Sequence, residues 1–127
     1  MESKTTINFG EFLHNKREEQ EITLRSMAQA LEISAPYLSD IEKGRRYAPE
    51  IDILNKIAAI LHLNSEERAI MLDLAGKTRN EVAPDLPEYI IQRDYVSAAL
   101  RTAKDLGVGE KEWLEFVQKM KSNKTKK

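Results

Sequence analysis

Apolar residues recur at spacings of three and four along most of the chain, which is the period of an α-helix rather than a strand. The pattern predicts five helices in the first part of the sequence, at about 9–19, 24–31, 34–43, 50–61 and 65–75. No run alternates Val, Ile, Thr and aromatic residues as a half-buried strand does. We therefore expect an all-α fold, with a five-helix domain at 7–76.

Residues suited to helix ends stand at the borders of these segments. Polar N-cap side chains and capping boxes accept backbone N–H bonds at a helix start, and glycine adopts the left-handed conformation that ends one. The predicted starts are Asn8 with Glu11, Thr23, Ser34, and Asn64 with Glu67; the predicted ends are Gly44 and Gly76.

The pattern changes after Gly76. Residues 77–87 lose the apolar spacing and contain two prolines, so we expect a linker or a strapped-down loop there. Helical spacing returns over 88–121, which predicts a C-terminal helical extension. Residues 122–127 hold three lysines and are expected to be a disordered tail.

Composition narrows the class of protein. The 127 residues are 41% hydrophobic and 32% charged, and they include no cysteine, which excludes disulfides and thiolate chemistry. No stretch approaches the roughly 18 apolar residues of a membrane span, and the polar start at 1–6 is unlike a secretory signal, so a cytoplasmic location is expected. The net charge is −1, so any surface that binds nucleic acid must be a local cluster.

The segment 23–44 has the form of a helix-turn-helix, in which the second helix lies in the major groove of DNA. It reads TLRSMAQALEISAPYLSDIEKG. Ala28 is small enough for the two helices to cross closely. Ile33, Leu38 and Ile41 are expected to hold the second helix to the core.

The outward positions of the second helix are then Ala35, Pro36, Tyr37, Ser39, Asp40 and Lys43. Ser39 is suited to a base edge or a phosphate, and Tyr37 to a phosphate or to stacking on sugar and base. Ala35 is short enough to meet a thymine methyl group, and Asp40 is repelled by phosphate unless it accepts from a cytosine amino group.

Basic residues follow the helix directly. Lys43, Arg45 and Arg46 are suited to phosphate contacts. Three basic residues are more often a solvated charge run, but their position after a recognition helix favours the functional interpretation.

Residues 9–63 resemble the Cro/phage-repressor (Xre-type) helix-turn-helix family of transcriptional regulators. The resemblance rests on the order and spacing of Arg17, Thr23, Met27-Ala28, Ile33-Ser34, Tyr37-Leu38-Ser39, Ile41-Glu42-Lys43-Gly44, Arg45-Arg46 and Pro49. It implies a repressor-like domain that binds double-stranded DNA with the helix at 34–43. Residues beyond about 76 match no family pattern, so no family role is transferred to them.

The resemblance also implies roles for single residues. Thr23 caps the first helix of the motif, Ser34 to Asp40 face the groove, and Arg45 and Arg46 face the backbone. Arg17 and Glu42 form a structural ion pair, and breaking one partner of such a buried pair costs about 3–5 kcal/mol.

Two positions depart from the family pattern. Many members have Gln where this chain has Leu24 and Arg25, so Arg25 is expected to supply the phosphate contact. Many members have Gly at the turn where this chain has Glu32, which must adopt a left-handed conformation at modest cost.

We therefore expect a sequence-specific DNA-binding regulator, acting as a repressor and as a homodimer. The alternative is an antitoxin-like protein-interaction module that binds a partner protein through its C-terminal helices. An enzyme is the weakest hypothesis, because no nucleophile–base pair or phosphate loop is present. His14 and His62 lack neighbours at metal-ligand spacing, so neither a metal nor a cofactor is expected.

Overall fold

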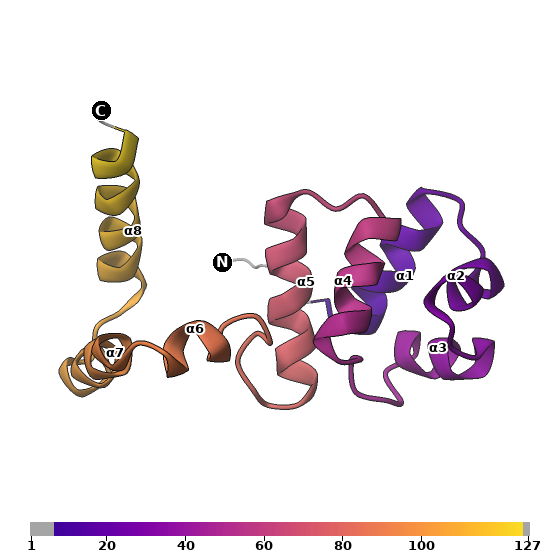
Figure 1. Cartoon of the computed structure of the whole chain (residues 1–127), viewed down its shortest axis with the longest axis horizontal. Coiled ribbons are helices and arrows are strands. Elements are labelled where there is room, and N and C mark those ends of the chain that lie inside the picture. Colours follow the sequence, from indigo (N-terminus) through magenta and orange to yellow (C-terminus); the bar gives the residue numbers. More distant parts are fainter. Residues whose placement is uncertain (1–6, 126–127) are drawn as a thin grey trace. The chain divides into compact units, whose positions relative to one another are not determined.

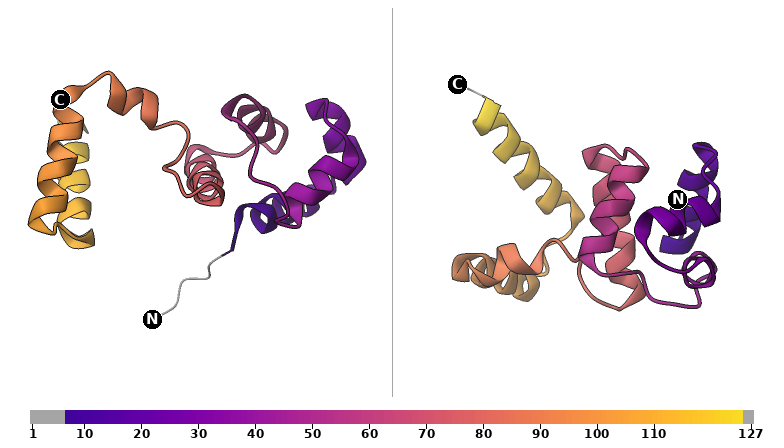
Figure 2. Two further views of the ribbon diagram at one scale, coloured as in Figure 1. Left: turned by 90° about the horizontal axis from the view of Figure 1, so that it is seen from below. Right: turned by 45° about the vertical axis from the view of Figure 1, so that its right-hand side comes forward.

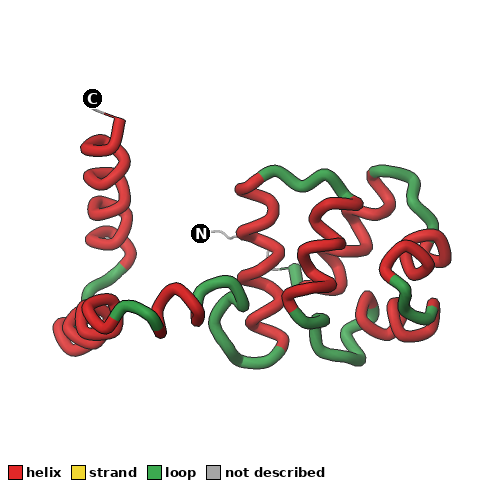
Figure 3. Tube along the Cα trace, viewed as in Figure 1, coloured by secondary structure: helices red, strands yellow, loops and turns green. Residues whose placement is uncertain are grey.

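A computed structural model describes residues 7–125, and every regular element in that range is a helix (Figure 3). The chain divides into two compact units, unit 1 up to Pro87 and unit 2 from Glu88. Unit 1 contains α1 (Phe9–Glu19), α2 (Leu24–Leu31), α3 (Ala35–Glu42), α4 (Ile51–Ile60) and α5 (Ser65–Thr78). The predictions of an all-α fold and of five helices in the first part are confirmed.

Local sequence signals set the helix starts of unit 1. Asn8 and Asn64 accept the backbone N–H of Glu11 and Glu67, whose side chains accept from the Asn backbone in return, so both predicted capping boxes are present. Satisfying these N–H groups removes part of the cost of beginning a helix.

The core of unit 1 is formed by the apolar faces of all five helices. Helix α1 packs against α3 and α5, while α2 packs against α3 and α4. Figures 1 and 2 show α2 and α3 together at the end of unit 1 that lies away from α5. The side chains that are almost wholly buried are Phe9, Leu13, Met27, Leu31, Leu38, Ile41, Leu54, Ile57, Leu61, Met71 and Leu72.

The predicted end of the fifth helix was wrong. Helix α5 runs through Gly76 and ends at Thr78. Gly76 is needed for a close approach instead, because a Cβ at this position would lie 2.5 Å from the carbonyl oxygen of Val82. The chain folds back on the helix here: the Glu81 N–H donates to the Gly76 carbonyl at 2.9 Å, and Ala83 is buried in the core cluster.

Unit 2 contains α6 (Pro87–Ile91), α7 (Asp94–Leu106) and α8 (Glu110–Thr125). Figure 2 shows α7 and α8 as two rods joined by the short connection at 107–109, where Gly107 is left-handed with φ of +69°. Among the described residues of unit 2, no side chain is buried.

The tail predicted at 122–127 is helical as far as Thr125, so the boundary expected at Lys121 was wrong. No Gly or Pro interrupts this stretch, and a lysine near a helix C-terminus interacts favourably with the helix dipole. Residues 126–127 lie outside the described residues. So do residues 1–6, which were predicted not to be a secretory signal. Among the described residues, no helix combines the length and apolar character that crossing a bilayer requires.

Candidate nucleic-acid interface

Helices α2 and α3 meet through a tight turn that local bonds define. Glu32 ends α2 with φ of +62° and ψ of +39°, so this non-glycine residue adopts the left-handed conformation expected of it. The Ile33 N–H donates to the Ala28 carbonyl at 3.0 Å. Ala28, Leu38 and Ile41 are each at most 2% exposed, which confirms that they lie between the helices and the core.

The two N-cap hydroxyls begin the helices of this motif. Thr23 Oγ1 accepts from the Ser26 N–H at 3.0 Å, and Ser34 Oγ accepts from the Tyr37 N–H at 3.1 Å. A hydroxyl that accepts one bond keeps its own proton for donation. Both groups therefore have the capacity to cap a helix and to donate to an external oxygen.

The outer face of α3 is open to solvent. Ser34 and Pro36 are exposed, whereas Ala35, Tyr37, Ser39 and Asp40 are half-buried. Their partial burial leaves each with an accessible edge and a fixed position. The structure thus places the predicted base-reading residues on a single helix and its cap.

The predicted phosphate-binding residues flank this face. Arg25 on α2 is exposed, as are Lys43, Arg45 and Arg46 beyond α3. Two contacts tie the last pair to the helix: Arg45 lies 3.6 Å from Asp40, and the Arg46 guanidinium lies 5.6 Å from the centre of the Tyr37 ring. Arg45 therefore offsets part of the negative charge that Asp40 would present to DNA.

Arg17 and Glu42 form a bidentate ion pair between α1 and the end of α3. The Nε–Oε2 distance is 2.8 Å and the Nη2–Oε1 distance is 2.9 Å. Their side chains are 8% and 7% exposed, so the pair is shielded from water. Arg17 also donates to the Ile22 carbonyl at 2.8 Å, which joins the α1–α2 connection to the same network.

The pKa values of the pair reflect these contacts. Burial by itself would raise the pKa of the Glu42 carboxyl, but hydrogen bonds with Arg17 and His14 outweigh it and hold that pKa below its ordinary value. The hydrogen bond with Glu42 raises the pKa of Arg17 against the opposing effect of burial. His14 Nδ1 lies 3.1 Å from Glu42 Oε1, so its role is in this network.

The end of helix α5 contacts the loop at 45–48, which carries Arg45 and Arg46. The sequence analysis did not predict this contact. Thr78 Oγ1 accepts from the Ala48 N–H at 3.0 Å and donates to the Ala75 carbonyl at 2.7 Å. Arg79 donates to the Ala48 carbonyl at 3.0 Å and lies 5.2 Å from the centre of the Tyr47 ring. The partners are about 30 residues apart, and no local spacing encodes them.

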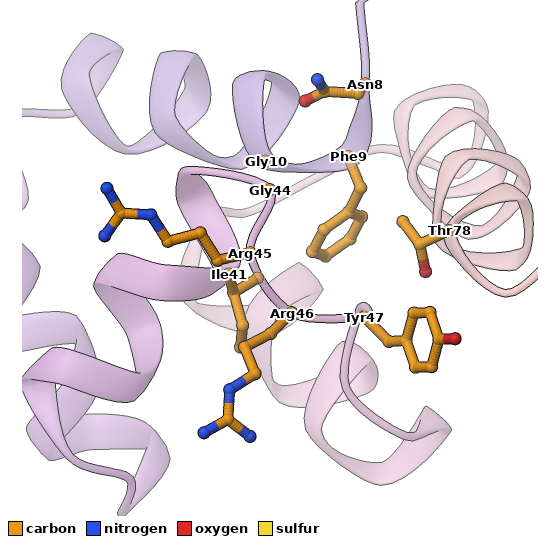
Figure 4. A pocket seen from close by; sticks show the side chains of 9 residues that line it. All are labelled: Asn8, Phe9, Gly10, Ile41, Gly44, Arg45, Arg46, Tyr47 and Thr78. Carbon is orange, nitrogen blue, oxygen red and sulfur yellow. The ribbon is translucent and has the colours of Figure 1, made fainter.

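A pocket of about 260 Å³ lies between the start of α1 and this loop (Figure 4). Its charged lining residues, Arg45 and Arg46, are both cationic, and Figure 4 shows their side chains extending from the loop in different directions. The pocket therefore adds to the positive character beside the end of α3. It is lined by Asn8, Phe9, Gly10, Ile41, Gly44, Arg45, Arg46, Tyr47 and Thr78.

Replacing Thr78 with Val is expected to loosen the loop at 45–48. Valine keeps the shape but removes the acceptor, which leaves the N–H of buried Ala48 unpaired at a cost of about 1–3 kcal/mol. Urea unfolding and amide exchange at Ala48 measure the two effects. Thr78→Ser retains the hydroxyl and should retain protection; equal exchange in both variants would contradict the assignment.

Among the described residues, no group of three or more His, Asp or Glu side chains is arranged to hold a metal ion. The candidate site is the outer face of α3 with its basic flanks, which the exposed positions of that helix define.

Known proteins are similar to this chain in the region that contains α2 and α3. Residues 8–70 match the family described as a helix-turn-helix domain. An uncharacterised HTH-type transcriptional regulator of Mycobacterium tuberculosis, Rv0474, is 37% identical over 57 residues, which are 45% of this chain and 40% of the relative. The ImmF control region 10 kDa protein of Bacillus phage phi105 is 42% identical over 55 residues, which are 43% of this chain and 60% of the relative.

One solved structure, of a SinR protein/SinI protein complex, is similar with a TM-score of 0.47 and 23% identity, covering 93% of this chain and 99% of that one. The segments matched in the two curated relatives span slightly less than half of this chain and between 40% and 60% of the relatives' own length. The family match at residues 8–70 contains the whole of α1 to α4, and with them the motif at α2 and α3. Residues 8–70 of this chain therefore match the helix-turn-helix domain family, which supports a regulator of the Cro/phage-repressor (Xre) type.

Proposed function

We propose that this protein binds double-stranded DNA in a sequence-specific manner and regulates transcription, with α3 in the major groove. The observation that carries the proposal is the outer face of α3, which lies between exposed basic residues on both sides. The residues that it presents are Ser34, Ala35, Pro36, Tyr37, Ser39 and Asp40. Base edges are read by such a face, while the flanking cations contact phosphates and fix the register. Repression is the direction that the family favours.

We also propose that the protein acts as a homodimer. Helix α3 has eight residues, about 12 Å of helix, and so reaches only a few base pairs. Two copies related by a two-fold axis would double the contact and read half-sites about 34–36 Å apart. A dimer is thus the simplest way for this short helix to read a specific operator.

A second candidate function, an antitoxin-like module that binds a partner protein, is favoured by the exposed apolar side chains of unit 2. Leu106 and Ile91 are each 75% exposed, and Tyr95 is 70% exposed. Co-purification of one small protein in stoichiometric amount would support this role. It is compatible with DNA binding by unit 1.

Selection of bound sequences from a random duplex library tests the proposed function. A salt concentration of about 150 mM suppresses binding to phosphates alone. Enrichment of an inverted repeat is expected, with a half-site spacing that gives the dimer geometry. Folded protein that enriches no sequence would overturn the proposal and place the interaction module first.

Arg45→Ala combined with Arg46→Ala is expected to weaken binding to the selected duplex and to lower its salt dependence. Each lost phosphate contact reduces the slope of log K against log salt by about 0.9. Lys104→Ala with Lys111→Ala is the matched control, because it removes the same charge from exposed positions of unit 2. Equal slopes in the two double variants would show that the arginines do not contact phosphate.

A further inference from the structure

Helix α8 carries an apolar stripe that stays partly exposed within unit 2. Trp113, Phe116, Val117 and Met120 follow helical spacing and are 37%, 50%, 36% and 44% exposed. The rings of Trp113 and Phe116 pack edge to face, with centroids 6.1 Å apart, so the stripe is continuous. An isolated helix of this length is marginal in water, and apolar area gains stability only when it is buried.

Charge is divided along the same helix. The half at 110–117 contains three glutamates and one lysine, a net charge of −2, whereas the half at 118–125 contains three lysines and no acid, a net charge of +3. The partner that fits α8 must therefore be basic opposite the first half and acidic opposite the second. A second α8 running in the opposite direction has this distribution.

We propose that α8 pairs antiparallel with α8 of a second copy of this chain, across a two-fold axis near the middle of the helix. This inference rests on the dimer of the proposed function and names its interface. The apolar stripe is centred between Phe116 and Val117, close to the middle of α8, so reversing one helix places apolar residues on apolar residues. A parallel pair would instead set glutamates against glutamates and lysines against lysines.

The charged residues beside the apolar stripe are also placed as antiparallel pairing requires. At 100° per residue, Glu112 and Lys119 lie about 100° and 120° to the same side of Trp113. In an antiparallel two-fold pair, the same flank of each helix meets, so Glu112 of one copy faces Lys119 of the other, twice over. Glu115 lies on the opposite side of the helix from the stripe and faces away from the partner.

Self-association of the full chain, measured by sedimentation without DNA, tests the interface. Glu112→Lys is expected to raise the dimer Kd about tenfold at low salt, because two attractions become repulsions. Lys119→Glu should do the same, and the double variant E112K/K119E should return the Kd to within about twofold. Glu115→Lys is the matched control and should leave the Kd unchanged.

The direction of pairing is tested by disulfide formation, since the chain has no cysteine of its own. A mixture of Trp113→Cys and Met120→Cys chains is expected to oxidise mainly to the mixed dimer, because both positions lie on the stripe that faces the partner. Disulfides need Cα atoms about 4.4–6.8 Å apart, while like positions in an antiparallel pair are about 10 Å apart along the axis. Rapid formation of both like dimers would establish parallel pairing and overturn the proposal.

A chain that stays monomeric at micromolar concentration would also overturn the proposed α8 pairing. The apolar stripe would then be a candidate binding surface for a different protein. These measurements contain no DNA. A failure of sequence selection therefore leaves their result intact, and dissociation of the dimer leaves the α3 face available for a half-site.

Discussion

Replacing Glu42 with Gln is expected to lower the free energy of unfolding of unit 1 by about 3–5 kcal/mol. The substitution keeps the shape of the side chain but leaves the Arg17 guanidinium, 8% exposed, without a counter-charge. Breaking one partner of a buried pair costs this much because the remaining charge stays out of water. Urea unfolding followed by circular dichroism measures the effect; fluorescence of the single Trp, on α8 in unit 2, would not report on it.

Glu18→Gln is the matched control for this prediction. It makes the same chemical change on α1 at a side chain that is 63% exposed, and surface changes of this kind stay within about 0.5 kcal/mol. Equal stability of the two variants would mean that the Arg17–Glu42 pair contributes nothing to the fold.

The effect of Glu42→Gln should also depend on pH. The pKa of the Glu42 carboxyl is lower in the folded protein than its ordinary value, so the carboxylate stabilises the fold above about pH 4.5. This stability is lost as the pH falls through the folded pKa. The difference between parent and variant should therefore be complete at pH 7 and shrink below about pH 4.5, and a constant difference down to acid pH would contradict the assignment. Glu67, whose pKa is also lowered, is present in both proteins and cancels.

The sequence revealed α1, α2 and α3 because two local signals agree there. Apolar spacing marks the buried face, and side chains such as Asn8, Thr23 and Ser34 mark the starts with bonds to residues three positions on. The motif at α2 and α3 depends on the same short-range signals. Its solvent-facing positions follow directly once the buried Leu38 and Ile41 are known.

Long-range contacts could not be found in this way. Gly76 was interpreted as a helix end because glycine often has that role, whereas here it admits the backbone of Val82 against the helix. Thr78 and Arg79 fell in a predicted linker, yet they bind the backbone of Ala48 in the basic loop. In each case the residue contacts another segment of the chain, and the spacing of apolar residues within one helix cannot predict such a contact.

Gly10→Ala is expected to separate the start of α1 from the end of α3. An added Cβ would lie 2.3 Å from the Glu42 carbonyl oxygen and 2.7 Å from that of Ile41, and both are backbone atoms that cannot move aside alone. Overpacking of this kind costs about 1–3 kcal/mol and occasionally more. Alanine gains only about 0.8–1 kcal/mol over glycine in helix propensity, so the steric term should win.

Thermal unfolding provides the measurement, since about 1 kcal/mol shifts Tm by roughly 4–8 °C in a domain of this size. Gly109→Ala is the control, because its nearest contact would be the flexible Glu112 carboxylate at 3.5 Å. The same displacement should weaken DNA binding, because the carbonyls that meet Gly10 lie at the end of α3, directly before Arg45 and Arg46. A Gly10→Ala protein with unchanged Tm and unchanged affinity would mean that α1 does not fix the position of the recognition helix.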